Sequence, residues 1–263
     1  MENYKENCRT ILKILTGKEN VKFTEKGDFS IKYALEIAKN LDKLNCLIQD
    51  EGNWYKYEKF INEKEMNCIR LITNYGLIFE KELKHYSHDS VLLLNSLAGY
   101  IAMHDMAKVH SSCITNDIFL INDVSGSIGT NNSKFGEIII GSFGKGKPVD
   151  LGHGGFIAVD DDEWFKDLED FEIDFKSLEE KLRNVNKRRE FLTSICKKVK
   201  DDLKDFDIVH KDEEGINVVV KFSNEEEKNK ILNYCKEHNY EYTMCPREIR
   251  IMEDAVSIEI KRL

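Results

Sequence analysis

Seven short apolar segments, most of them separated by helical patterns, constrain the fold of this chain more than any other feature. The candidate strands lie at 21–24, 46–49, 68–73, 91–95, 118–122, 138–140 and 155–159. Between the first two, apolar residues recur at helical spacing over 30–41. Strands that alternate with helices form largely parallel sheets that are covered on both faces. The sequence therefore predicts an α/β fold with a seven-stranded, mostly parallel sheet.

The chain changes character after Asp160, where four consecutive acidic residues are followed by a long charged helical segment at about 177–204. Beyond it we expect a strand at 216–222, a helix at 225–238 and strands near 241–244, 248–252 and 256–260. This order predicts a small α+β C-terminal domain. We therefore divide the chain into a large domain, 1–165, and a small domain, 166–263.

Charge and composition exclude several classes of protein. The net charge of −9 argues against a general nucleic-acid binder. No run of about 18 apolar residues is present and the N-terminus lacks the apolar core of a signal peptide, so we expect a cytoplasmic protein without a membrane span. The seven cysteines are scattered and form no C-x-x-C pair, which indicates reduced thiols.

Polar and glycine residues gather directly after the predicted strands. Asn95 ends the fourth strand and Asp123 follows the fifth. The loop between the sixth and seventh strands is rich in glycine and contains Lys145 and Lys147. Glycine lets the backbone approach a ligand closely, and ligands of such sheets bind at the carboxyl ends of the strands. The sequence therefore predicts a ligand site at this edge.

The spacing within the glycine-rich loop carries a family resemblance. Lys147 lies five residues after the serine of Ser142-Phe143, and the pair Gly154-Gly155 follows it. Asp123 precedes Gly129 by six residues. Over nearly the whole chain, this order resembles the fold-type I pyridoxal-phosphate enzymes, most closely the DegT/DnrJ/EryC1/StrS aminotransferase-like group.

The resemblance implies that Lys147 holds pyridoxal 5'-phosphate as an internal aldimine, since a lysine amine forms such a bond reversibly. It also implies that Asp123 pairs with the protonated pyridine nitrogen and that Trp54 stacks on the ring. The residues assigned to the cofactor's phosphate are Gly27, Ser30 and Ser142. The alternative for Lys145 and Lys147 is that both are surface charges or bind another phosphate.

Two further residues are implied as substrate contacts. Arg250 lies in the predicted strand at 248–252, and a small-domain arginine in many of these enzymes grips a substrate carboxylate with its fork. Asn95 matches the active-site loop more loosely. For Arg250, a surface ion pair is the equally simple interpretation.

Two positions depart from the family pattern. Asp28 stands beside Gly27 where the family has Thr or Ser, and its charge is unsuited to a phosphate, although it could cap the helix. Gly126 stands where the family has Gln or His. The contact to the cofactor's phenolic oxygen must therefore come from Ser125 or Ser127, or be missing.

The function expected from the resemblance is a PLP-dependent aminotransferase acting on a small-molecule amine or keto substrate as a homodimer. Neither nucleic acid nor a membrane is expected as a partner, and the histidines show no metal-ligand pattern. Two alternatives stay open. One is a non-catalytic or degenerate relative that acts in binding or assembly, and the other is a PLP-dependent lyase or cysteine desulfurase.

Overall fold

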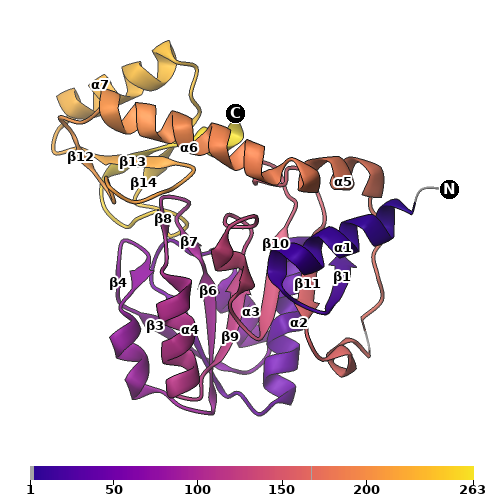
Figure 1. The fold of residues 1–263 in the computed structure, drawn as a ribbon. Coiled ribbons are helices and arrows are strands. Elements are labelled where there is room, and N and C mark those ends of the chain that lie inside the picture. The colour runs from indigo at the N-terminus through magenta and orange to yellow at the C-terminus, as the bar shows by residue number, and fades with distance from the viewer. Residues whose placement is uncertain (1–2, 167) are drawn as a thin grey trace.

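The computed structural model describes residues 3–166 and 168–263, and its centre is a seven-stranded sheet (Figure 1). In spatial order the strands are β3 (Asn67–Leu71), β2 (Asn45–Gln49), β6 (Ser90–Asn95), β9 (Phe119–Asp123), β10 (Ile138–Ser142), β11 (Gly155–Val159) and β1 (Asn20–Thr24). Strand β11 runs antiparallel to both of its neighbours, and the other neighbouring pairs are parallel. The seven predicted strands and the mostly parallel sheet are confirmed.

Helices cover both faces of this sheet. On one face lie α2 (Gly27–Asn40) and α3 (Tyr57–Glu63), and on the other lie α1 (Tyr4–Thr16), α4 (Met106–Thr115) and α5 (Phe175–Arg183). Strand β2 shows why: Cys46 and Ile48 pack with the first pair of helices, whereas Leu47 packs on the side of α4. Because both faces are buried, the three consecutive central residues of this strand, 46–48, are all apolar.

Short hairpins and 3-10 turns occupy the connections: β4 (Thr73–Asn74), β5 (Leu77–Ile78), β7 (Leu97–Ala98), β8 (Ala102–Met103), η1 (Glu80–His85), η2 (Asn131–Lys134), η3 (Asp162–Phe165) and η4 (Ile260–Arg262). The hairpin β7–β8 lies next to the C-terminal part of the chain, and Leu97 and Tyr100 belong to that part's apolar core. The two parts of the molecule are therefore packed together.

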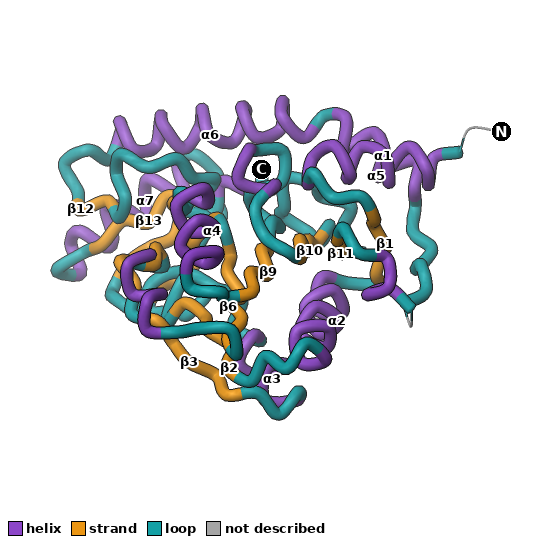
Figure 2. The backbone as a smooth tube through the Cα atoms, turned by 60° about the horizontal axis from the view of Figure 1, so that its bottom comes forward, coloured by secondary structure: helices purple, strands orange, loops and turns teal. Residues whose placement is uncertain are grey.

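The C-terminal part is a second, antiparallel sheet with two helices. Its strand order is β12 (Asp207–Ile208), β13 (Val218–Lys221), β15 (Ala255–Ile258) and β14 (Tyr242–Cys245). The long helix α6 (Val185–Asp202) and α7 (Glu225–Glu237) pack against it, and α6 extends from the end of α5 (Figure 2). The predicted small α+β unit is confirmed as an architecture. The division at residue 165 stays a prediction.

Two details of the C-terminal prediction are wrong. The helical segment at 177–204 is two helices, which meet at Asn184. The strand predicted at 248–252 is a tight turn, in which the Arg250 N–H donates to the Arg247 carbonyl at 2.7 Å. A strand would point alternate side chains to opposite faces, whereas the turn directs the Arg250 side chain into the buried interior.

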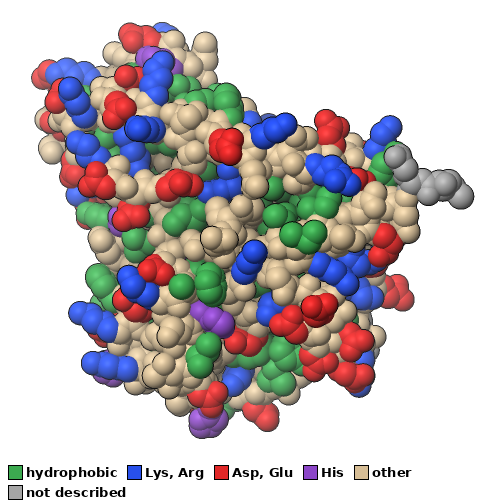
Figure 3. Space-filling view, viewed as in Figure 1, with side chains coloured by type: hydrophobic (Ala, Val, Ile, Leu, Met, Phe, Trp, Pro, Cys, Tyr) green, Lys and Arg blue, Asp and Glu red, His purple; other side chains and the backbone are tan. Residues whose placement is uncertain are grey.

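The exterior carries both signs of charge. Acidic and basic side chains are interspersed over the face drawn in Figure 3. Within residues 3–166 and 168–263, no helix is both long and apolar enough to cross a membrane.

Candidate active site

A cavity of about 420 Å³ lies where the carboxyl ends of β6, β9 and β10 meet the C-terminal sheet. It gathers residues from the start of α2, the strand ends, the loop after β10 and the last part of the chain. Ser30 and Ser127 do not line it, whereas eight of the predicted site residues do: Gly27, Trp54, Asn95, Asp123, Ser125, Ser142, Lys147 and Arg250. The fold therefore brings residues far apart in the sequence to one place, at the edge that was predicted.

Ser30 is the predicted phosphate contact that does not line the cavity. It is completely buried, and its hydroxyl shares a hydrogen bond of 2.7 Å with the Thr24 hydroxyl. This contact ties α2 to the end of β1. Ser30 is therefore part of the core in this structure, and the expectation that it faces a ligand is not met.

Asp123 is a buried carboxylate at the end of β9. Its Oδ2 accepts a hydrogen bond from the Tyr57 hydroxyl at 2.6 Å, and its Oδ1 accepts one from the Ser125 N–H at 2.9 Å. Burial, together with the Asp123 charge, raises the pKa of Tyr57 well above its ordinary value, so this phenol is a neutral donor. Because an ionised carboxylate has about four acceptor positions, Asp123 can still accept a donor from the cavity.

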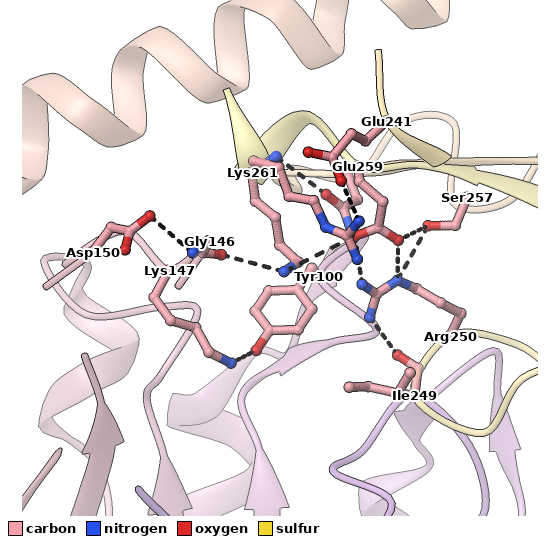
Figure 4. Close-up of polar contacts among 12 residues, drawn as sticks. Tyr100, Gly146, Lys147, Asp150, Glu241, Ile249, Arg250, Ser257, Glu259 and Lys261 are labelled. Atoms are coloured by element: carbon pink, nitrogen blue, oxygen red, sulfur yellow. Dashed lines mark hydrogen bonds and ion pairs between the residues drawn. The ribbon is translucent and has the colours of Figure 1, made fainter. Parts of the chain in front are cut away.

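Lys147 points to Tyr100 across the cavity (Figure 4). Its Nζ donates a hydrogen bond to the Tyr100 hydroxyl and lies 4.6 Å from the centre of that ring. The ring is also 4.7 Å from Lys261 Nζ and 5.2 Å from Arg250 Cζ. The electron-rich face of an aromatic ring attracts cations placed over it. Tyr100 therefore organises the three positive groups of this wall.

Lys261 is a buried amine in the same wall. Its Nζ donates to the Gly146 carbonyl at 3.3 Å, and the nearest carboxylate oxygen, on Glu259, is 3.9 Å away. Burial, with the charges of Lys147 and Arg250, lowers the pKa of Lys261 to about 7. The amine can therefore gain or lose its proton near neutral pH.

Arg250 is held by the chain itself. Its Nη2 lies 2.6 Å from Glu259 Oε2 and its Nε 2.9 Å from Oε1, while Nη1 donates to the Ile249 carbonyl at 2.8 Å. Burial alone would raise the pKa of Glu259, but the charge and hydrogen bonds of Arg250 lower it to about 2. The guanidinium fork expected to grip a substrate is thus engaged by an internal, 1% exposed carboxylate.

Trp54 and Asp28 form a second polar unit of the cavity. The Trp54 Nε1–H donates to Asp28 Oδ1 at 3.0 Å, and Lys56 Nζ donates to Asp28 Oδ2 at 2.8 Å. The hydrogen bond to Asp28 raises the pKa of Lys56. Asp28 lies in the first turn of α2, and the N-cap position belongs to Lys26. The expected helix cap is therefore replaced by a bridge to Trp54 and Lys56.

The remaining predicted residues shape the backbone around the cavity. The Ser142 N–H donates to the Ser125 hydroxyl at 3.0 Å, and the Ser142 hydroxyl accepts from the Gly144 N–H at 3.1 Å. A Cβ at Gly27 would lie 2.6 Å from the Ser142 Cβ, so only glycine fits there without movement. Asn95 Nδ2 donates to the Gly52 carbonyl at 3.2 Å, which uses one end of its amide within the fold.

Sequence reasoning missed four residues of this site: Lys56, Tyr57, Tyr100 and Lys261. Tyr57 reads as an apolar position of a helix, and its link to Asp123 spans 66 positions. Lys261 is one lysine in a sequence of which 33% is charged, so nothing in the sequence distinguishes it from a surface lysine. Only the position of Tyr100, immediately after the glycine that follows the fourth strand, gave a local signal.

Comparisons with known proteins find a family model for part of the chain and many solved structures with a similar fold. A family model described as the MJ1341 family C-terminal domain matches residues 186–263. No curated protein matches the chain. Many solved structures do. One is 3-amino-5-hydroxybenzoic acid (AHBA) synthase, at 13% identity and a TM-score of 0.74, covering 99% of this chain and 86% of that one.

Two further matches are structures with a bound cofactor. NtdA from Bacillus subtilis, with bound PMP, has 15% identity and a TM-score of 0.73 over 100% of this chain and 74% of that chain. GDP-4-keto-6-deoxy-D-mannose-3-dehydratase from E. coli, with bound hydrated PLP, has 14% identity and a TM-score of 0.73 over 98% and 87%. The chain has the fold of these enzymes. At such identities the likeness establishes the fold, and the chemistry must be argued from the residues.

Proposed function

We propose that this chain is a pyridoxal-phosphate-dependent enzyme of fold type I, of the DegT/DnrJ/EryC1/StrS kind, and that it acts as an aminotransferase through Lys147. One observation carries the proposal. The amine of Lys147 and the buried carboxylate of Asp123 line one cavity at the carboxyl ends of β9 and β10. The bound PMP and PLP in two of the similar structures support the choice of cofactor.

The residues at the ring end of the cavity fit such a cofactor. Asp123 keeps accepting capacity for a protonated ring nitrogen, and Trp54 and Tyr55 supply an aromatic wall. The volume of about 420 Å³ falls within the range of about 300–1,000 Å³ that is typical of small-molecule sites. The helix end at Gly27 and the hydroxyl of Ser142 would adjoin the phosphate.

When bound, the cofactor supplies an aldehyde and an electron-withdrawing ring. The residues of the chain then have separable tasks. Lys147 would hold the cofactor and, once released, move a proton at its Nζ. Asp123, fixed by Tyr57 and Ser125, would keep the ring nitrogen charged. Tyr100 would orient the Lys147 amine through its hydroxyl.

Reaction type and assembly belong to the proposal as well. An amine or keto compound is the proposed substrate, a homodimer the proposed assembly, and the cytoplasm the proposed location. A desulfurase is disfavoured, because the cavity walls in the described part of the chain contain no cysteine. Cys245 is the cysteine nearest in sequence to a lining residue. It is buried, and burial raises the pKa of its thiol.

A second candidate is a relative that keeps the fold for binding or assembly. Two observations favour it: Asp28 carries a negative charge at the phosphate end, and Lys147 is already hydrogen-bonded to Tyr100. The two candidates differ in one property, which is whether Lys147 forms a covalent bond with the cofactor.

The test is to add pyridoxal 5'-phosphate to the purified protein, record the visible spectrum, reduce with borohydride and map the modified peptide. We expect a visible band that borohydride bleaches, with the label on Lys147. Lys147→Ala should lose the band and the label. Lys145→Ala is the matched control, because Lys145 is an exposed lysine of the same loop. A folded protein with no band would support the second candidate instead.

A further inference from the structure

Asp28 is an internal anion at the phosphate end of the proposed site. It stands in the first turn of α2, a helix of 14 residues, and lines the cavity beside Gly27 and Ser142. The N-terminal end of a helix attracts negative charge. Here that charge already comes from the side chain of the chain itself.

The donors around Asp28 are also engaged. Each carboxylate oxygen has its own partner, Trp54 Nε1 for Oδ1 and Lys56 Nζ for Oδ2. The Asp28 side chain is about a quarter exposed, at 26%, so solvent reaches this unit only in part. A second anion placed beside it would meet a charge of its own sign in a region where water screens incompletely.

The ring end of the cavity lacks this conflict. Asp123 is fixed by Tyr57 and Ser125 and retains acceptor capacity, and Lys147 needs only an aldehyde carbon. The two ends of the site therefore differ in how well they suit the two ends of a pyridoxal phosphate molecule.

Resting on the function proposed above, we infer that Asp28 determines the ligand specificity of the site by weakening its hold on a phosphate. The ring and the bond to Lys147 then supply most of the affinity. The site accepts a phosphate-free pyridoxal compound nearly as well as the phosphorylated one. Removal of the Asp28 charge restores a preference for phosphate.

The experiment compares two probes that differ only at the phosphate end. Pyridoxal 5'-phosphate and 5-deoxypyridoxal share the ring and the aldehyde. Both are titrated into the protein at fixed ionic strength, and the dissociation constant is taken from the visible band that depends on Lys147. The ratio of the two constants measures the phosphate's contribution.

For the natural chain we expect the two constants to agree within about tenfold. Asp28→Asn keeps an oxygen that can accept from Trp54 but removes the charge. We expect this variant to lower the dissociation constant of pyridoxal 5'-phosphate at least about tenfold. The dissociation constant of 5-deoxypyridoxal should change by less than about twofold. Asp28→Ser, with a smaller neutral side chain, should shift the ratio in the same direction.

The matched control is Asp105→Asn. Asp105 caps α4, a position where asparagine also serves, and it is an acidic residue outside the cavity wall. Asp105→Asn changes the net charge by the same amount as Asp28→Asn and should leave the ratio of the two dissociation constants unchanged. Circular dichroism verifies that each variant is folded.

The outcomes separate the two proposals. If neither probe gives a reducible bond to Lys147, the proposed function fails. If both do, but the phosphate dominates affinity in the natural chain and both Asp28 variants leave the ratio unchanged, the role of Asp28 is refuted while the function stands.

Discussion

The ring of Tyr100 occupies the space that a side chain at position 126 would need. A Cβ on Gly126 would lie 3.0 Å from Cδ1 and Cε1 of Tyr100 and 2.9 Å from Cδ2 of Leu97. Glycine at 126 and the placement of Tyr100 are therefore one structural feature. The residue that departs from the family pattern makes room for the phenol that contacts Lys147.

The first prediction concerns that packing. Gly126→Ala should destabilise the protein by about 1–3 kcal/mol, because the added methyl group overpacks a buried contact. Urea unfolding measures the change. Gly144→Ala is the control, since its Cβ would meet only the Ser142 hydroxyl oxygen at 3.2 Å. Equal midpoints for the two variants would contradict the account of position 126.

The second prediction concerns the hydroxyl of Tyr100. Tyr100→Phe keeps the ring but removes the oxygen to which Lys147 donates. That hydrogen bond orients the Lys147 amine, and a hydrogen bond of this kind is worth on the order of 1 kcal/mol. We therefore expect Lys147 to react about fivefold more slowly with pyridoxal 5'-phosphate at pH 7. Stopped-flow absorbance gives the rate, and Tyr55→Phe, at the exposed wall, serves as the comparison. An unchanged or faster reaction would show that the hydroxyl does not position the amine.

The third prediction concerns the buried pair of Arg250 and Glu259, whose side chains are 4% and 0% exposed. Glu259→Gln leaves an uncompensated guanidinium in the interior and should cost about 3–5 kcal/mol of unfolding free energy. Glu241→Gln breaks the outer pair with Arg262, whose side chains are 35% and 61% exposed, and should cost about 1 kcal/mol or less. Similar losses in the two variants would mean that Arg250 is not held in the way the structure shows.

Local pattern was sufficient to predict the sheet and most of the residues that gather at its edge. Apolar runs such as 46–48 specify buried strands, and Asp123 and Ser142 are the last residues of their strands. Side-chain direction was beyond reach. Ser30 points inward to a hydrogen bond with Thr24, and Arg250 points inward to an ion pair with Glu259. These partners come together only in the folded chain.

Partners distant in sequence explain the residues that were missed. Tyr57 acquires its role from Asp123, and Tyr100 from Lys147, 47 positions away. Tyr57 carries no spacing signal of its own, and Tyr100 carries only its position after the glycine that follows the fourth strand. A single sequence therefore locates the ends of strands, whereas the contacts that tune those ends depend on tertiary packing.

The last prediction concerns Lys261 and pH. In the folded protein its pKa is lowered to about 7, mainly by burial, whereas in the unfolded chain a lysine titrates near about 10.4. Between these values the unfolded chain binds more protons, so the folded state gains stability as pH rises. Below about pH 7 the amine is charged in both states, and its full destabilising effect is present.

Lys261→Met removes this titration while keeping a flexible apolar side chain. We expect the unfolding free energy of the natural protein, relative to this variant, to be constant from about pH 5 to 6.5 and then to rise by up to about 1.4 kcal/mol per pH unit towards pH 9. Urea unfolding of the cofactor-free protein across this range provides the measurement. Lys145→Met, at an exposed position, should stay parallel to the natural protein throughout. Parallel curves for Lys261→Met as well would show that the Lys261 amine is not buried among the charges of Lys147 and Arg250.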